Sequence, residues 1–201
     1  MKNSRKKYVV GIIGGIATGK STIAKYLKTF NIPIIDTDII AQRLYDPEQP
    51  GFEPIVERYG QDILKNDHID RKKLADIIYA SPCEKMWLEQ LLHPLVRCVS
   101  LNELKDDCSY NILMIPLLKD RNNYPLDQVI LTHASFETQV KRLNEYRNIN
   151  EKKAQMIINN QPSFEQQSLI ADHIINTDKE LSEVYETVKK IHEELILIFN
   201  S

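Results

Sequence analysis

One stretch of the chain combines glycines, a lysine and a serine at the spacing of a phosphate-binding loop. Residues 14–21, GGIATGKS, match the pattern G-x-x-x-x-G-K-[ST] at every defined position. Glycines let the backbone curl so that successive N–H groups point inward, and the start of a following helix adds positive charge. The lysine then reaches the β- and γ-phosphates, and the serine hydroxyl binds Mg²⁺. We predict a nucleoside triphosphate site at Gly15, Ile16, Ala17, Thr18, Gly19, Lys20, Ser21 and Thr22.

The segments on either side of this motif favour the phosphate loop over a chance glycine-rich turn. Residues 8–14 form a short apolar run that ends in glycines and is typical of a buried parallel strand. In residues 20–30, Ile23, Leu27 and Phe30 recur at helical spacing. Residues 32–36 read as a second buried strand, so a βαβ unit and a parallel sheet are expected.

Two carboxylates follow this second strand and raise a separate question. Asp36 and Asp38 in PIIDTDII can make a turn, cap a helix, hold a metal or supply a base. In a parallel sheet, a carboxylate at the carboxyl end of a strand next to the phosphate loop faces the ligand crevice. The residues themselves leave these roles open.

The rest of the chain predicts an α/β fold with helical additions. Further strands are expected at residues 111–118, 128–134 and 172–177, and a terminal helix at 181–199. Residues of about 62–105 and 136–161 read as helical excursions. We expect one domain over 1–201, an α/β fold with a parallel sheet and helices on both faces.

Composition excludes several other classes of protein. The net charge is −2, so no global field favours nucleic acid, and no apolar run approaches the roughly 20 residues that span a bilayer. Cys83, Cys98 and Cys108 show no C-x-x-C pairing and no nearby histidine cluster. We expect buried or half-buried thiols in a reducing cytoplasm.

Three kinds of P-loop protein compete for this sequence: a switch GTPase, a motor-type ATPase and a small-molecule kinase. A GTPase carries an N-K-x-D guanine motif, which this chain lacks. A motor ATPase places an acidic residue at the end of an apolar strand, whereas LMIPLLKD reaches Asp120 only after a lysine. A short chain with a lid and an acceptor-binding insertion favours the kinase.

The chain resembles the dephospho-coenzyme A kinases. The stretches GIIGGIATGKST, IIDTDIIA, DRKKL, LLHPLVR, IPLL, QVKRL and ADHIINT occur in the order and at about the spacing of that family. The resemblance implies transfer of the ATP γ-phosphoryl to the ribose 3′-hydroxyl of dephospho-coenzyme A, with Mg²⁺, in the last step of coenzyme A synthesis. It also implies a cytoplasmic monomer or weak homo-oligomer whose partners are ATP and dephospho-coenzyme A, without nucleic acid or membrane. The fold that it implies is a nucleoside-kinase-like P-loop kinase domain over 1–201, with an acceptor-binding helical insertion at about 62–105 and a helical lid at about 138–161.

The resemblance also implies roles for individual residues of this chain. Asp38 matches the second aspartate of the family's D-x-D, the general base, while helix capping is its alternative; Asp36 would shape the turn or hold a water of the Mg²⁺ shell. Lys20 and Arg142 complete the predicted catalytic set, and Ser21 is the metal ligand. The predicted acceptor-binding residues are Asp38, Arg71, His93, Arg97 and Leu117.

Each acceptor residue has an ordinary structural alternative. His93 and Arg97 can form a surface pair, Arg71 can be a solvated residue at a helix start, and Leu117 can fill the core. Pro94 is expected to break or kink the helix and to present His93 at its end. Asn176 fits a position near the adenine base or a turn.

Four departures from the family pattern concern the lid and the rim of the pocket. Tyr146 stands where a second lid arginine is usual, with Arg147 one place on, and Ile157 replaces another arginine. Gln42 replaces the arginine after the D-x-D motif, and Lys119 and Asp120 stand where a glutamate is usual. They keep two alternatives open: another small-metabolite or nucleoside kinase, and a non-catalytic nucleotide-binding regulator.

Overall fold

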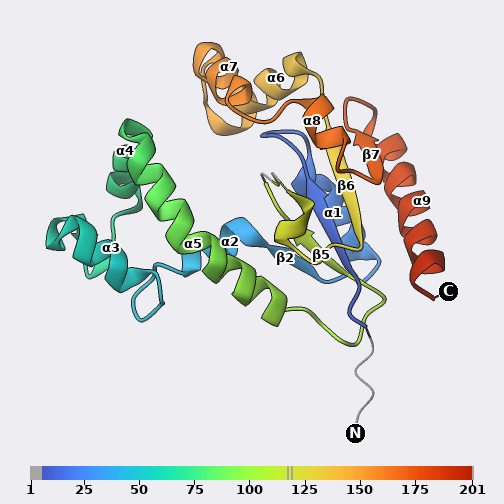
Figure 1. The fold of residues 1–201 in the computed structure, drawn as a ribbon. Helices are drawn as coiled ribbons and strands as arrows, with labels where there is room; N and C mark the ends of the chain where they lie inside the picture. Colours follow the sequence, from blue (N-terminus) through green and yellow to red (C-terminus); the bar gives the residue numbers. More distant parts are fainter. Residues whose placement is uncertain (1–5, 117, 119, 201) are drawn as a thin grey trace, which may run out of the picture. The chain divides into compact units, whose positions relative to one another are not determined.

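The computed structural model describes residues 6–116, 118 and 120–200 (Figure 1). They form two compact units, one made of the chain up to Ile35 and from Leu104 onward, the other of Asp36–Glu103. The strands are β1 (Val9–Ile13), β2 (Ile34–Asp36), β3 (Leu64–Lys65), β4 (His68–Ile69), β5 (Asn111–Met114), β6 (Gln128–His133) and β7 (His173–Asn176). The helices are α1 (Lys20–Thr29), α2 (Thr37–Arg43), α3 (Phe52–Tyr59), α4 (Arg71–Ala80), α5 (Pro82–Asn102), α6 (Phe136–Arg147), α7 (Glu151–Asn159), α8 (Phe164–Ser168) and α9 (Leu181–Asn200), with 3-10 turns η1 (Gln61–Ile63) and η2 (Arg121–Asn123).

A parallel sheet organises the first unit. Its strand order is β2-β5-β1-β6-β7, and β1 pairs in parallel with both β5 and β6. After β1, the strands β2 and β5 lie on one side of β1 in the strand order, and the later strands β6 and β7 lie on the other side. The order therefore reverses next to β1, and parallel sheets bind ligands beyond the carboxyl ends of their strands at such a point. The glycine-rich motif follows β1 directly.

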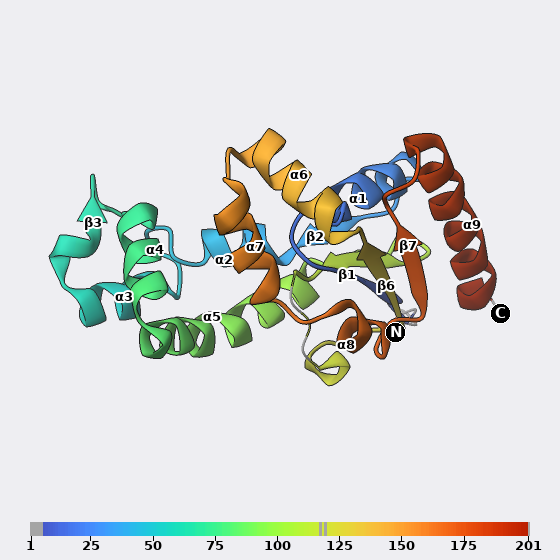
Figure 2. The ribbon, with the colours of Figure 1, turned by 90° about the horizontal axis from the view of Figure 1, so that it is seen from above.

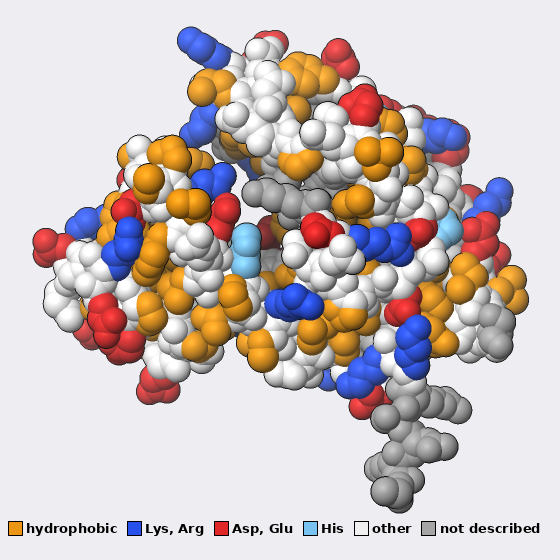
Figure 3. Space-filling view, viewed as in Figure 1, with side chains coloured by type: hydrophobic (Ala, Val, Ile, Leu, Met, Phe, Trp, Pro, Cys, Tyr) orange, Lys and Arg blue, Asp and Glu red, His pale blue; other side chains and the backbone are white. Residues whose placement is uncertain are grey.

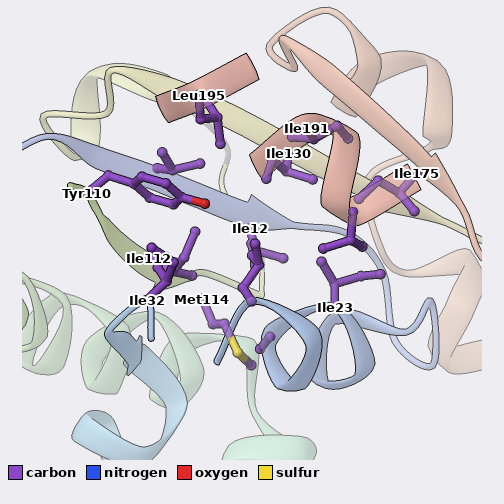
Figure 4. Packing of buried hydrophobic residues seen from close by; sticks show 14 of the residues in the cluster. Ile12, Ile23, Ile32, Tyr110, Ile112, Met114, Ile130, Ile175, Ile191 and Leu195 are labelled. Carbon is purple, nitrogen blue, oxygen red and sulfur yellow. The ribbon is translucent and has the colours of Figure 1, made fainter. Parts of the chain in front are cut away.

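One face of this sheet is covered by α1 and α9. Ile12, Ile130 and Ile175 of the strands pack in one buried cluster with Ile23 of α1 and Leu195 of α9 (Figure 4). These side chains are at most 1% exposed. Burial of each large aliphatic side chain contributes roughly 1.5–3 kcal/mol to the stability of the fold, which explains why α9 packs on this face of the sheet.

Side chains alternate between the two faces of a strand, so the neighbours of Ile130 point the other way. Leu131 lines a cavity together with Phe164 and Gln167 of α8, which identifies α8 as a cover of the opposite face. The view from above shows α1 and α8 on different sides of β6 (Figure 2). The predicted parallel α/β fold with helices on both faces is confirmed.

The second unit is built around α3, α4 and α5. Ile55, Val56, Ile63, Ile69 and Leu74 form its buried cluster, all at most 9% exposed. Between η1 and α4 the chain forms an antiparallel hairpin of β3 and β4. The sequence reading missed both this hairpin and α3. Most of the range 62–105, expected as a helical insertion, lies in this unit.

Two local expectations in the second unit are wrong. Pro94 does not end a helix, because α5 continues from Pro82 to Asn102 and buries Leu92, Val96 and Ser100 along one side. His93 is therefore exposed within the helix and not at its end. Cys83 and Cys98 are exposed, since they lie away from that buried side, and only Cys108 is half-buried as expected.

The surface agrees with the balanced composition. On the face in Figure 3, acidic and basic side chains alternate with apolar ones and gather in no large area of one sign. Among the residues described, no helix is long and apolar enough to cross a membrane.

Candidate active site

The phosphate loop joins β1 to α1 through three residues with positive φ. Gly14 has a φ of 142°, and an added Cβ would lie 2.4 Å from the Thr132 hydroxyl oxygen. Gly19, at 93°, ends the loop as the N-cap of α1, and Ala17 has a φ of 59°. Side chains rarely adopt these conformations, so the glycines are required by both backbone and space. The curl leaves the loop ahead of the N-terminus of α1, a favourable place for an anion.

Lys20 is held within this loop. Its Nζ donates hydrogen bonds of 2.6 Å and 2.7 Å to the carbonyl oxygens of Gly14 and Gly15. Lys20 is half-buried, and these two hydrogen bonds hold its charge at the loop. A cation fixed in this way matches a polyphosphate, whose charge it can partly neutralise.

Two buried threonines from distant segments, Thr132 and Thr177, form hydrogen bonds to Thr18 of the loop. The hydroxyl of Thr18 bonds to that of Thr132 on β6 at 2.7 Å, and Thr132 donates to the Ile13 carbonyl at 3.2 Å. Thr177, beyond β7, donates to the Thr18 carbonyl at 2.9 Å. Sequence reasoning missed Thr132 and Thr177 as site residues: Thr132 belongs to no quoted motif, and Thr177 ends the stretch ADHIINT but was given no role. The polar residue inside the apolar run QVILTHA was the available signal for Thr132.

The predicted lid contacts the loop at both of its ends. Arg142 of α6 donates to the Ala17 carbonyl at 3.0 Å and to the Thr177 carbonyl at 2.6 Å. Gln161, after α7, accepts the backbone N–H of Ile16 at 2.7 Å through Oε1. The structure thus brings Arg142 to the loop as the sequence analysis expected. No role was predicted for Gln161 from the sequence, and its contact with the loop comes from the structure alone.

Asp178 holds the N-terminus of α6, the first helix of the predicted lid. Its carboxylate accepts the N–H of Ser135, the N-cap of α6, at 2.9 Å and 3.1 Å. Burial raises the pKa of this carboxyl, but the hydrogen bonds from Thr138 and Ser135 outweigh it, so the net pKa is lowered. Next to it, the side chain of Asn176 accepts the Asp178 N–H at 2.8 Å and makes the turn that was one of its two expected roles.

The remaining lid and metal candidates are exposed. Tyr146 is 79% exposed, and Arg147 lies in the last turn of α6. Ser21 is exposed in the first turn of α1, and its hydroxyl makes no hydrogen bond to a residue that the structure describes. No group of three or more His, Cys, Asp or Glu side chains over 6–116, 118 and 120–200 could hold a metal ion by itself.

The two aspartates of the D-x-D motif occupy different positions in the second unit. Asp36 is the N-cap of α2, and its Oδ1 accepts the N–H groups of Asp38 at 2.9 Å and Ile39 at 3.4 Å. The turn-shaping role expected for Asp36 is confirmed, and capping by Asp38 is wrong. Asp38 lies in the first turn of α2 with an exposed side chain, where the helix dipole favours its negative charge.

The described acceptor candidates lie on different helices of the same unit. Arg71 begins α4 and donates to the Gln42 side chain at 3.1 Å and to Asp46 at 3.2 Å, so it joins α4 to the end of α2. His93 and Arg97 are exposed on successive turns of α5, and no hydrogen bond or ion pair links them among the described residues. Leu117 lies outside the described residues.

The sheet order, the phosphate loop and the solved structures that match this chain define the class of protein: a P-loop kinase. A crystal structure of a Thermus thermophilus protein matches with a TM-score of 0.78 and 25% identity, covering 94% of this chain and 98% of that chain. Shikimate kinase from Acinetobacter baumannii, at 14% identity, matches in fold with a TM-score of 0.55 over 97% and 96% of the two chains.

The sequence comparisons define the family. The dephospho-CoA kinase family model matches residues 8–183. The dephospho-CoA kinase of Vibrio parahaemolyticus serotype O3:K6 is 36% identical over 192 residues, 94% of each chain. The chain belongs to the dephospho-CoA kinase family.

Proposed function

We propose that this chain transfers the γ-phosphoryl group of ATP to the ribose 3′-hydroxyl of dephospho-coenzyme A and so performs the last step of coenzyme A synthesis. The observation that carries the proposal is the phosphate loop with Lys20 bonded inside it at 2.6 Å and 2.7 Å. In the transfer, the bond between the γ-phosphorus and the bridging oxygen breaks and ADP leaves. A new bond forms between that phosphorus and the 3′-oxygen, whose proton passes to a base.

Asp38 is our candidate for that base. Its carboxylate is exposed, while Asp36 is committed to the cap of α2. Phosphoryl transfer is mostly positioning and charge stabilisation, so the base need only orient the hydroxyl and accept its proton late. Lys20 would stabilise charge on the β- and γ-phosphates, and Arg142 would do so from the lid.

The second unit would contribute groups that bind the phosphates of the acceptor. Arg71, His93 and Arg97 are exposed there and offer cationic or hydrogen-bonding groups suited to the phosphates of dephospho-coenzyme A. Leu117 remains a proposed pocket residue on the strength of the family pattern. In the first unit, the side-chain amide of Asn176 would meet the adenine of ATP.

Mg²⁺ fits the donors at the end of the loop. Mg²⁺ in kinases is held mainly by phosphate oxygens with one or two protein oxygens, and Ser21 offers an exposed hydroxyl beside Lys20. When bound, the ion would neutralise charge on the transferred phosphoryl group. We further propose a cytoplasmic enzyme that acts as a monomer or weak homo-oligomer, without nucleic acid or membrane.

A coupled assay tests the reaction. ADP release from Mg-ATP should rise with dephospho-coenzyme A well above the rates with adenosine, AMP or shikimate. No stimulation by dephospho-coenzyme A would refute the proposal. Preference for another acceptor would favour a different small-metabolite kinase, and no turnover with retained ATP binding would indicate a regulator.

A pair of variants tests the division between the aspartates. Asp38→Asn should lower kcat by about 10²- to 10⁴-fold, the usual size of a general-base effect, with ATP binding retained. Asp36→Asn is the matched control, because asparagine caps a helix as well as aspartate does, and its kcat should stay near wild type. The reverse pattern would give the base role to Asp36.

A further inference from the structure

A cavity of about 290 Å³ lies in the first unit beside the phosphate loop. Its walls come from Gly15 of the loop, the end of β6, the last turn of α7 and the start of α8. No Asp, Glu, Lys or Arg is among its described lining residues. Ligand sites span roughly 300–1,000 Å³, so this volume suits one arm of a ligand and not a whole dinucleotide.

Three glutamines of the polar lining, Gln139, Gln161 and Gln167, each have one of their two side-chain amide atoms hydrogen-bonded within the protein. Gln139 donates through Nε2 to the Ala134 carbonyl at 3.0 Å, and Gln167 does so to the Pro162 carbonyl at 2.9 Å. Gln161 uses Oε1 to accept from the loop. For these three side chains, no partner of the opposite amide atom occurs in the described part of the chain. Two acceptors and one donor are therefore available, held in place by the bonds already made.

The apolar part of the lining is equally well defined. Ile158 and Leu131 contribute aliphatic surface, and Phe164 packs against His133 with ring centroids 4.2 Å apart. Gln167 is only 6% exposed whereas Phe164 is 37% exposed, so the cavity has a buried wall and an opening to solvent. A mostly apolar cavity with a few fixed polar groups is the usual form of a small-molecule site.

We propose that this cavity binds the pantetheine arm of the acceptor. The inference rests on the proposed function. The arm is an uncharged chain of amides, a hydroxyl and aliphatic carbons that ends in a thiol, and its amides and aliphatic carbons match the glutamines and the apolar residues of the lining. The phosphates of the same molecule would require cations, which the described lining does not offer. The 3′-hydroxyl must meet the γ-phosphate at the loop, and Gly15 places the cavity beside that loop.

A filled cavity tests the assignment. Ile158→Trp adds bulk to a lining residue, whereas Ile157→Trp adds the same bulk to the adjacent half-buried residue of α7, which is not among the lining residues. For Ile158→Trp we expect the KM for dephospho-coenzyme A to rise about ten- to hundredfold, the range for loss of apolar complementarity in a pocket. The KM for ATP should not change. Ile157→Trp should leave both constants unchanged.

An acceptor without the arm separates this site from the rest of the enzyme. AMP carries the 3′-hydroxyl and the adenine but no pantetheine, so Ile158→Trp should bind it as wild type does. Calorimetry with the nucleotide site filled by a non-transferable ATP analogue gives the same comparison without turnover. Weakening of AMP and dephospho-coenzyme A by equal factors, or of neither, would overturn the arm site. A wild-type enzyme inactive on dephospho-coenzyme A would instead overturn the proposed function.

Discussion

The contacts inside the first unit span much larger sequence separations than the contacts inside the second unit. In the first unit, the loop contacts join residues far apart: Thr18 and Thr132 are separated by 114 positions, and Ile16 and Gln161 by 145. In the second unit, Arg58 bonds to Glu84 across 26 positions. The phosphate loop is thus fixed by contacts over more than a hundred positions, whereas the second unit uses contacts over shorter separations, such as that between Arg43 and Glu103 across 60 positions.

The contacts at the phosphate loop are also more deeply buried than the Arg58–Glu84 contact of the second unit. Thr18 and Thr132 are at most 4% exposed, and their hydrogen bond is shielded from water. Arg58 stacks over Trp87 at 4.4 Å and pairs with Glu84, but the arginine side chain is 36% exposed. Exposed ion pairs contribute little, whereas a buried polar group is costly to leave unpaired. The comparison predicts that single changes disturb the first unit more strongly than the second.

The largest effect is expected at Lys20. Lys20→Met removes the cation at the loop and should lower kcat by about 10²- to 10³-fold, the usual loss for one preorganised electrostatic group. Steady-state kinetics with Mg-ATP measures it. Lys25→Met, an exposed lysine on the same helix, is the control and should act as wild type. A loss below tenfold at Lys20 would contradict the role of the loop.

A core truncation tests whether the second unit unfolds by itself. Leu74→Ala should cost about 2–5 kcal/mol of its stability, because Leu74 is 4% exposed in a small cluster. Trp87 is the single tryptophan and lies in this unit, so its fluorescence reports unfolding there. In urea, the midpoint of Trp87 fluorescence should fall while ATP binding persists. Simultaneous loss of both signals would show one cooperative unit.

Thr132 tests the buried support of the loop. Thr132→Val keeps the shape of the side chain but leaves the Thr18 hydroxyl without this partner, which should cost about 1–3 kcal/mol. Thermal unfolding and ATP affinity should both decrease. The control is Thr187→Val on α9, whose hydroxyl bonds only within its own helix. Equal effects of the two variants would show that the threonine pair is unimportant.

The smallest effects are the responses of the two units to acid. Burial lowers the pKa of His192 below 6.5, so the folded state of the first unit disfavours its protonation and loses stability as the pH falls below 6.5. Hydrogen bonds from Arg58 and Tyr59 lower the pKa of Glu84 from 4.5 to about 2. Its contribution is complete above 4.5 and is lost as the pH falls towards 2.

Acid should therefore weaken the first unit before the second. Circular dichroism during urea unfolding, compared with Trp87 fluorescence across the pH range, measures the two responses. His192→Phe should remove part of the first decrease and Glu84→Gln part of the second. If Trp87 fluorescence responded first, the assignment of these groups would be wrong.

The sequence predicted most of the framework because that framework is periodic and local. The runs around β1, α1, β6, β7 and α9 were placed within a few residues, since burial on one face imposes a recognisable spacing. The cap at Asp36 also depends only on its neighbours. The expected strand at 111–118 was too long, because β5 ends at Met114.

The failures share a different physical origin. Pro94 is tolerated inside α5 because burial of Leu92 and Val96 outweighs the loss of a backbone hydrogen bond. Short elements such as α3 and the β3–β4 hairpin carry too few residues to show a period. The family pattern correctly took Arg142 to the loop, but it gave no role to Thr132.

The sequence by itself determined the phosphate loop, the parallel sheet and the family, because each is written in adjacent residues or in regular spacing. Only the tertiary structure decided which side chains support that loop. Thr132, Gln161 and Thr177 lie more than a hundred residues along the chain from it, and no motif gave them a role in supporting the loop. Their role depends on which strands become neighbours, and that order is fixed by packing of the whole sheet.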